Sequence, residues 1–184
     1  MNQIILISGP PGAGKSAVGA ALSERFDRML LVEVDDLRHM VLAGYRHPWF
    51  GDQQTREQLR LGARNAAAIA LESVATRYSV AIADVITSEA APWYREALAD
   101  APVRVELVTL LPSLETVQAR NAERDAAMQE RAEALHAQLT SEVGAGTIPG
   151  AVLDTSGHAN ARESADAAQD AISRGLASFI EPSG

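Results

Sequence analysis

One glycine-rich octapeptide, 9-GPPGAGKS-16, lies between a short apolar run, Ile4–Ser8, and a segment with helical periodicity, Ser16–Phe26. It fits the pattern G-x-x-x-x-G-K-[ST] at every fixed position. Glycine adopts backbone conformations that a Cβ disfavours, so the chain can turn sharply between the apolar run and the helix. This order of elements predicts a buried strand, a tight loop and a helix, which is the opening of a parallel α/β sheet.

The same alternation of apolar runs and helical segments continues along the chain, and several runs are nearly continuous in apolar residues, as in strands buried on both faces. The predicted strands are Ile4–Ser8, Leu30–Val34, Ser79–Asp84, Val103–Leu110 and Ala151–Asp154. The predicted helices are Ser16–Phe26, Asp36–Ala43, Thr55–Tyr78, Pro92–Ala99, Ser113–Arg124, Gln129–Val143 and Ala161–Phe179. We therefore predict a three-layer α/β/α fold around a five-stranded parallel sheet with right-handed crossovers.

Three of the predicted helices begin with recognisable capping signals. Ser113 follows Pro112 and is predicted to be an N-cap. The segments Thr55–Gln58 and Asn160–Glu163 have the spacing of a capping box. These signals place helix starts at residues 55, 113 and 160.

The composition predicts one globular domain over residues 1–184, with 47% hydrophobic and 22% charged residues. No apolar run reaches the roughly 18 residues that a membrane helix needs, and the N-terminus lacks the pattern of a signal peptide. The absence of cysteine excludes disulfides and thiolate sites. Without a membrane run, a signal peptide or cysteine, we predict a cytoplasmic protein. A net charge of −8 disfavours nucleic acid and anionic membranes as partners.

The octapeptide, residues 9–16, also predicts a phosphate-binding loop, or P-loop. Its glycines let backbone N–H groups surround a phosphate, and the following helix adds the positive end of its dipole. Lys15 is the only lysine among 16 basic residues, and it is predicted to contact the β- and γ-phosphates, while the Ser16 hydroxyl ligates Mg²⁺. The predicted nucleotide-binding residues are Gly9, Pro10, Pro11, Gly12, Ala13, Gly14, Lys15, Ser16 and Ala17.

Ligands of parallel sheets gather at the carboxyl ends of the strands, and two candidate aspartates lie at such positions, one after the second predicted strand and one at the end of the third. Asp35 follows the second strand, where a carboxylate is placed to accept the proton of a hydroxyl that attacks the γ-phosphate. Arg38 lies three residues on and is predicted to hold an anionic or polar acceptor. Asp84 ends the third strand. The alternatives are that Asp35 or Asp36 N-caps the next helix, which we expect of one of the two, and that Asp84 is merely a polar strand end.

The pairing of GPPGAGKS with 32-VEVDDLRHM-40 resembles the P-loop kinase family of polynucleotide 5′-hydroxyl kinases, chloramphenicol phosphotransferase, zeta toxins, and gluconate and shikimate kinases. The resemblance covers residues 1–125 and, more weakly, residues 153–156. It implies ATP as phosphate donor and a nucleotide-kinase-like strand order, with the Asp84 strand beside the P-loop strand. It also implies that Asp35 is the catalytic base, that Arg38 binds the acceptor, and that Asp84 contacts the acceptor or the metal.

In this family, arginines after the fourth strand form a lid over the phosphates, and the matching segment here is 120-RNAERD-125. Arg120 and Arg124 are four residues apart, so they are predicted to share one helix face and to neutralise charge on the transferring phosphoryl group. The lid region is predicted at about residues 120–145. The alternative is a solvated helix face on which Glu123 and Asp125 pair with the arginines.

Five of the eight aromatic residues lie in two short segments that follow strand ends: Tyr45, Trp49, Phe50, Trp93 and Tyr94. These side chains are predicted to wall a pocket for an apolar or ring-shaped acceptor, with Trp49 among the substrate-binding residues. The alternative is the ordinary packing of an inserted loop.

Together these features predict an ATP- and Mg²⁺-dependent kinase that phosphorylates a hydroxyl of a small molecule. The catalytic residues would be Lys15, Asp35, Arg120 and Arg124. Two other functions stay open. One is a polynucleotide 5′-hydroxyl kinase, which the net charge of −8 disfavours. The other is an ATP-binding or ATP-hydrolysing module that acts through a partner and needs no acceptor base.

Overall fold

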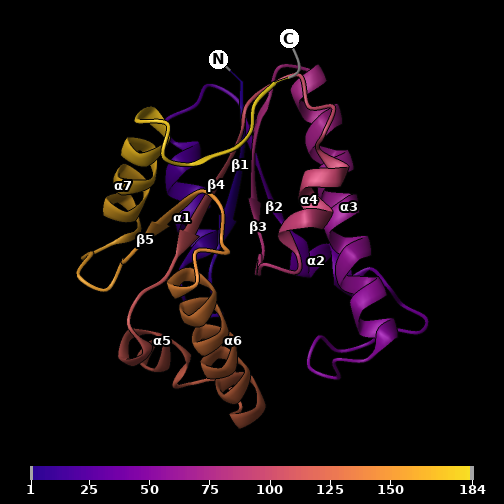
Figure 1. Cartoon of the computed structure of the whole chain (residues 1–184), viewed down its shortest axis with the longest axis vertical. Coiled ribbons are helices and arrows are strands. Elements are labelled where there is room, and N and C mark those ends of the chain that lie inside the picture. Colours follow the sequence, from indigo (N-terminus) through magenta and orange to yellow (C-terminus); the bar gives the residue numbers. More distant parts are fainter. Residues whose placement is uncertain (1, 183–184) are drawn as a thin grey trace.

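A computed structural model describes residues 2–182, in which helices cover both faces of one twisted sheet (Figure 1). The sheet contains five parallel strands in the order β2-β3-β1-β4-β5. Their bounds are β1 Ile4–Ser8, β2 Met29–Glu33, β3 Ser79–Ala83, β4 Val105–Leu110 and β5 Ala151–Leu153. The predicted parallel sheet is confirmed, and β3, which leads to Asp84, lies beside the P-loop strand β1 as expected.

The helices are distributed over three regions of the molecule (Figure 1). Helices α3 and α4 pack on one face of the sheet, α1 and α7 pack on the other, and α5 and α6 form a hairpin near the carboxyl ends of the strands. The helix bounds are α1 Lys15–Ser23, α2 Val34–His39, α3 Gln53–Ala75, α4 Ala91–Ala97, α5 Leu114–Asn121, α6 Ala126–Gly144 and α7 Ala161–Ser173.

The core on each face is built from aliphatic strand residues and helical alanines. Alternate residues of β1 face opposite ways, with Ile4 and Leu6 toward α3 and Ile5 and Ile7 toward α1. On α3, a buried row of alanines lets the helix backbone approach the sheet closely: Ala63, Ala66, Ala67 and Ala70. Both faces of the sheet are therefore covered by closely packed helices.

The C-terminal segment differs from its prediction. The predicted helix Ala161–Phe179 ends at Ser173, and a short strand, β6 Ser178–Ile180, pairs antiparallel with β4. Gly175 has φ +71°, and the N–H groups of Gly175 and Leu176 donate to the carbonyls of Ile172 and Ala171. This is a Schellman motif, in which the glycine takes the left-handed conformation that ends the helix.

Two of the three predicted helix starts are confirmed. Ser113 accepts a hydrogen bond from Thr116 N, and Asn160 accepts bonds from the N–H groups at the start of α7. The prediction for Thr55 is wrong, because Asp52 is the N-cap of α3 and accepts from Thr55 N. Within residues 2–182, none of the helices has the length and apolar character needed to cross a bilayer.

Candidate active site

The P-loop follows β1 and leads directly into α1. Gly9, Gly12 and Gly14 have φ values of +146°, +86° and +94°, which residues with a Cβ rarely adopt. A Cβ at Gly9 would overlap the carbonyl oxygen of Leu110, and one at Gly12 would overlap the amide nitrogen of Asn121. Glycine is therefore required at both positions by backbone conformation and by the close approach of neighbouring segments.

Lys15 is the first residue of α1, and its side chain folds back over the P-loop. Its Nζ donates to the carbonyl oxygens of Gly9 at 2.9 Å and Pro10 at 3.2 Å. Burial lowers the pKa of Lys15, whereas the negative charges of Asp84, Asp35 and Glu33 act to raise it. The only lysine of the chain thus lies near enough to three acidic side chains at the sheet edge for their charges to affect its pKa.

Ser16 and Ala17 lie in the first turn of α1 and are exposed. Among residues 2–182, no group of three or more His, Asp or Glu side chains is arranged to hold a metal ion. Mg²⁺ that enters with nucleotide phosphates needs only one or two protein ligands, and an exposed hydroxyl beside the P-loop suits that requirement. The residues present therefore fit Mg²⁺ with a nucleoside triphosphate.

The predicted convergence of Asp35, Asp84 and the P-loop is confirmed. Asp84 directly follows β3 and is buried, whereas Asp35 lies in the first turn of α2 with its side chain 70% exposed. Arg38 joins them, since its Nη1 donates to Asp84 Oδ1 at 3.1 Å and its Nη2 donates to Asp35 Oδ1. The expectation that Asp35 or Asp36 N-caps α2 is wrong, because the cap position is Glu33 and both aspartates lie inside the helix.

The ion pairs change the chemistry of these groups. Partial desolvation at the sheet edge tends to raise the pKa of Asp35, but the charge and hydrogen bond of Arg38 outweigh it, so the pKa is lowered. Arg38 is buried and its pKa is raised, because the attraction of Asp84 and Asp35 outweighs desolvation. Both terminal nitrogens of Arg38 thus donate to carboxylates of the protein, whereas the sequence predicted that Arg38 binds the acceptor.

The aromatic residues of the predicted pocket wall lie in two different environments. Tyr94 is fully buried, and its hydroxyl donates to Asp84 Oδ2 at 2.7 Å. Trp93 in α4 is partly buried and packs against the same core. The burial of Tyr94 thus removes this residue from the predicted wall. In the loop between α2 and α3, Trp49 and Phe50 are 45% and 52% exposed. Their rings pack on His47, with Trp49 stacked at a centroid distance of 4.3 Å.

The two predicted lid arginines occupy different environments. Arg120 lies in the last turn of α5, and its Nη1 donates to the carbonyl oxygens of Gly12 and Ala13, each at 3.3 Å. Arg124 lies beyond the end of α5, because Asp125 already caps α6. The predicted shared helix face is therefore wrong. The Arg124 side chain is exposed and makes no ion pair within the described part of the chain.

Sequence reasoning missed two further residues at this edge. Arg131 on α6 is partly buried, and burial and the nearby charge of Arg38 lower its pKa, while Asp35 acts to raise it. Asn121, at the end of α5, donates from Nδ2 to the carbonyl oxygens of Pro11 at 2.9 Å and Val117 at 2.7 Å. Nothing in the sequence distinguishes Arg131 from the other arginines, since its place depends on how the α5–α6 hairpin packs.

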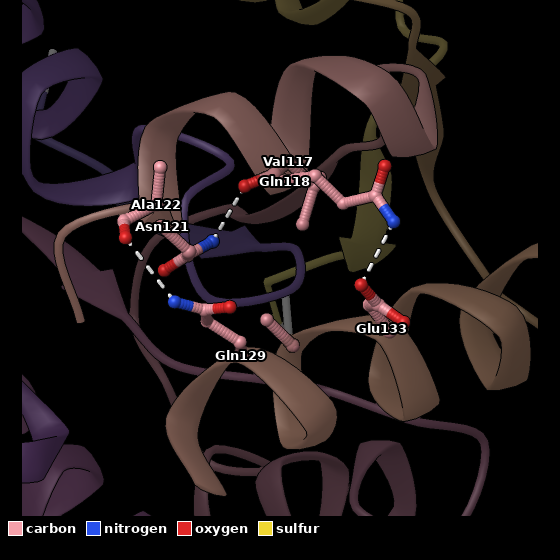
Figure 2. Close-up of a pocket in the computed structure, with 7 residues that line it drawn as sticks. Val117, Gln118, Asn121, Ala122, Gln129 and Glu133 are labelled. Carbon is pink, nitrogen blue, oxygen red and sulfur yellow. Dashed lines mark hydrogen bonds between the residues drawn. The ribbon is translucent and has the colours of Figure 1, made fainter. Parts of the chain in front are cut away.

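A cavity of about 260 Å³ lies between α5 and α6, next to the P-loop (Figure 2). Its walls are mostly polar and are formed by Val117, Gln118, Asn121, Ala122, Gln129, Ala132 and Glu133. Gln118 bridges the two helices by donating to Glu133, and Gln129 donates to the carbonyl of Ala122. The hairpin is thus held by side-chain hydrogen bonds around an incompletely packed interior.

Residues 4–143 match the protein family described as AAA domain. The chain belongs to this family. Comparison of this AAA domain protein with curated proteins gives no match.

Solved structures with the same fold include two kinases and a resistance protein. Shikimate kinase from Acinetobacter baumannii, in complex with shikimate, has a TM-score of 0.62 and 20% identity over 95% of this chain and 94% of that chain. The tunicamycin resistance protein of Deinococcus radiodurans has a TM-score of 0.65 and 17% identity over 99% and 100%. The APS kinase of Mycobacterium tuberculosis, in complex with AMPPNP and APS, has a TM-score of 0.60 and 18% identity over 94% and 98%. The predicted P-loop kinase fold is confirmed.

Proposed function

We propose that this AAA domain protein transfers the γ-phosphate of Mg·ATP to a hydroxyl group of a small molecule. The observation that carries the proposal is the joining of Asp35 and Asp84 through Arg38 at the carboxyl edge of the sheet, beside the P-loop strand. The charges of Asp35 and Lys15 also act on each other's pKa. A switch protein needs a residue that positions water, whereas a kinase needs a carboxylate beside the phosphates to receive an acceptor hydroxyl.

The P-loop and α1 would bind the triphosphate. Its backbone N–H groups and the N-terminus of α1 suit phosphate oxygens. Lys15 Nζ would exchange its bonds to the Gly9 and Pro10 carbonyls for the β- and γ-phosphates. Ser16 is the residue that would hold Mg²⁺, which supplies positive charge to the β- and γ-phosphate oxygens when bound.

Asp35 would orient the acceptor hydroxyl and receive its proton. Arg38 keeps this carboxylate ionised by lowering its pKa, so it is a weak base. A weak base suffices, because phosphoryl transfer passes through a loose transition state in which the hydroxyl proton is released late. We assign Arg38 and Asp84 the main role of holding Asp35 in place. A direct contact between Arg38 and the acceptor is a secondary role of Arg38.

Three arginines would balance the phosphate charge from the lid side. Arg120 already lies on the P-loop, and Arg131 lies close enough to Asp35 for their charges to interact. Arg124 is exposed at the turn between α5 and α6, from where closure of the hairpin would bring it toward the nucleotide. Positive charge from several directions stabilises the charge that spreads over the transferring phosphoryl oxygens.

The choice of a small acceptor rests on charge and on the solved structures. A chain with net charge −8 disfavours a polynucleotide, whose binding depends on many phosphate contacts. The shikimate kinase and APS kinase structures carry small molecules, namely shikimate and APS. The exposed rings of Trp49 and Phe50 favour an acceptor with an apolar or ring-shaped part.

An ATP-consumption screen over antibiotics, sugars, nucleosides and oligonucleotides tests this function. We expect one small-molecule class to stimulate ADP formation and to gain a phosphate by mass spectrometry, with Asp35→Asn as the inactive control. Stimulation by oligonucleotides would instead identify a polynucleotide kinase. ATP hydrolysis that no acceptor increases and that Asp35→Asn leaves intact would favour the hydrolysing module.

A further inference from the structure

Three side chains hold the backbone of the P-loop through its carbonyl groups. Its five consecutive carbonyl groups, residues 9–13, all accept side-chain hydrogen bonds. Lys15 donates to the first two, Asn121 to the third, and Arg120 to the fourth and fifth. When the N–H groups of a loop point toward a phosphate, its carbonyl groups point away from the phosphate. Carbonyl groups that are buried there need hydrogen-bond donors from the protein in place of water.

Asn121 is the most buried of these three donors, with only 1% of its surface exposed. Both N–H bonds of its Nδ2 are used, one to Pro11 O at 2.9 Å and one to Val117 O at 2.7 Å within α5. Figure 2 shows the second bond, which holds the amide against its own helix. Arg120, by contrast, is exposed and its two bonds are longer, at 3.3 Å. Asn121 is therefore the firmer link between α5 and the P-loop.

The chemistry of an amide explains why asparagine fits this place. One nitrogen with two N–H groups can serve two carbonyl acceptors at once, whereas the carboxylate of aspartate would repel both. The amide also lies so close to Gly12 that a Cβ there would overlap Nδ2. The conformation of Gly12 and the position of Asn121 thus depend on each other.

We propose that Asn121 is a positioning residue that holds the P-loop in its phosphate-binding conformation and couples this loop to the α5–α6 hairpin. This inference rests on the proposed binding of Mg·ATP. If the α5–α6 hairpin shifts when nucleotide binds, Asn121 shifts with it. The hydrogen bond from Asn121 to Pro11 then moves the P-loop and its N–H groups. Nucleotide binding and hairpin position are then linked reciprocally.

The test compares Asn121→Ala with Gln118→Ala. Gln118 lines the same cavity from the same helix but contacts Glu133 and not the P-loop, so it is a matched control. Calorimetric titration with Mg·ATP is expected to give a Kd at least about tenfold higher for Asn121→Ala, because a buried hydrogen bond is lost. The change in Kd for Gln118→Ala should be much smaller, because that variant keeps the bond between Asn121 and the P-loop. A second variant, Asn121→Leu, keeps the branched shape without any donor and should show the same loss.

A second readout separates positioning from a merely structural role. Amine-reactive labelling of Lys15 should be blocked by saturating Mg·ATP in the parent protein and in Gln118→Ala, but at higher nucleotide concentrations in Asn121→Ala. Circular dichroism at the assay temperature must show each variant folded. If Asn121→Ala is folded and binds Mg·ATP as tightly as the parent, or if Gln118→Ala weakens binding equally, the inference is wrong. A parent protein that binds no Mg·ATP contradicts the proposed function instead.

Discussion

Replacing Tyr94 by phenylalanine tests the buried network behind Asp35. The Tyr94 hydroxyl donates to Asp84 Oδ2 at 2.7 Å, and the two residues are 0% and 6% exposed, so water has little access to replace this bond. A hydrogen bond to a charged group contributes about 1.5–3 kcal/mol to the free energy of unfolding. We expect a loss of about 2 kcal/mol, which corresponds to a fall in Tm of roughly 4–8 °C for a chain of this size.

Thermal and urea unfolding at pH 7, followed by circular dichroism, measure this loss. Tyr78→Phe is the control, because its ring is 37% exposed and its hydroxyl has no hydrogen bond in the part of the chain that the structure describes. The control should stay within about 0.5 kcal/mol of the parent protein. A fall in Tm of less than about 1 °C for Tyr94→Phe, or equal falls for both variants, would refute the assigned hydrogen bond.

The pH dependence of unfolding gives an independent check on Tyr94. Burial and the neighbouring Asp84 raise the pKa of this phenol well above its usual value. A raised pKa contributes stability that is present below the unfolded pKa of about 10 and is lost as pH rises toward the folded pKa. The parent protein should therefore lose stability above about pH 10 more steeply than Tyr94→Phe. Parallel curves for the two proteins would mean that Tyr94 is not held protonated by its surroundings.

Three further predictions concern the P-loop edge, and a fourth concerns nucleic acid. Lys15→Arg should lose Mg·ATP binding by calorimetry as completely as Lys15→Ala, because a planar guanidinium does not fit where Nζ bonds the Gly9 and Pro10 carbonyls; an active arginine variant would contradict this. Asp35→Asn should keep its Kd for ATP and lose about 10²–10⁴-fold in the rate of phosphotransfer, measured with the acceptor that the screen identifies. Since Arg38 lowers the pKa of Asp35, the parent protein should also lose its stability advantage over this variant as pH falls below about 4, measured by Tm at each pH. Single-stranded and duplex DNA should bind weakly in fluorescence anisotropy and without a steep salt dependence, and tight, salt-sensitive binding would favour the polynucleotide kinase.

The local sequence determined the elements that depend on neighbouring residues. Strand β1 begins and ends where the apolar run predicts, and the glycine pattern that follows it forms the P-loop. Asp35 and Asp84 meet because parallel strands bring their carboxyl ends to one edge, which the alternation of strands and helices already implies. The helix starts at Ser113 and Asn160 were predictable because an N-cap bonds to residues two or three positions away.

Only the tertiary structure decided which side chains complete the site. Arg38 reaches Asp84 across 46 positions of sequence, and Asn121 reaches Pro11 across 110. No pattern in the sequence predicts such pairs, because they depend on how α2 and the α5–α6 hairpin pack against the sheet edge. The packing of α4 with α3 on the sheet buries Tyr94, whose hydroxyl reaches Asp84, where the sequence indicated only an aromatic residue after a strand. Motifs that depend on local backbone geometry can therefore be predicted from the sequence. The partners of the charged and polar side chains are instead determined by contacts between segments that are distant in the sequence.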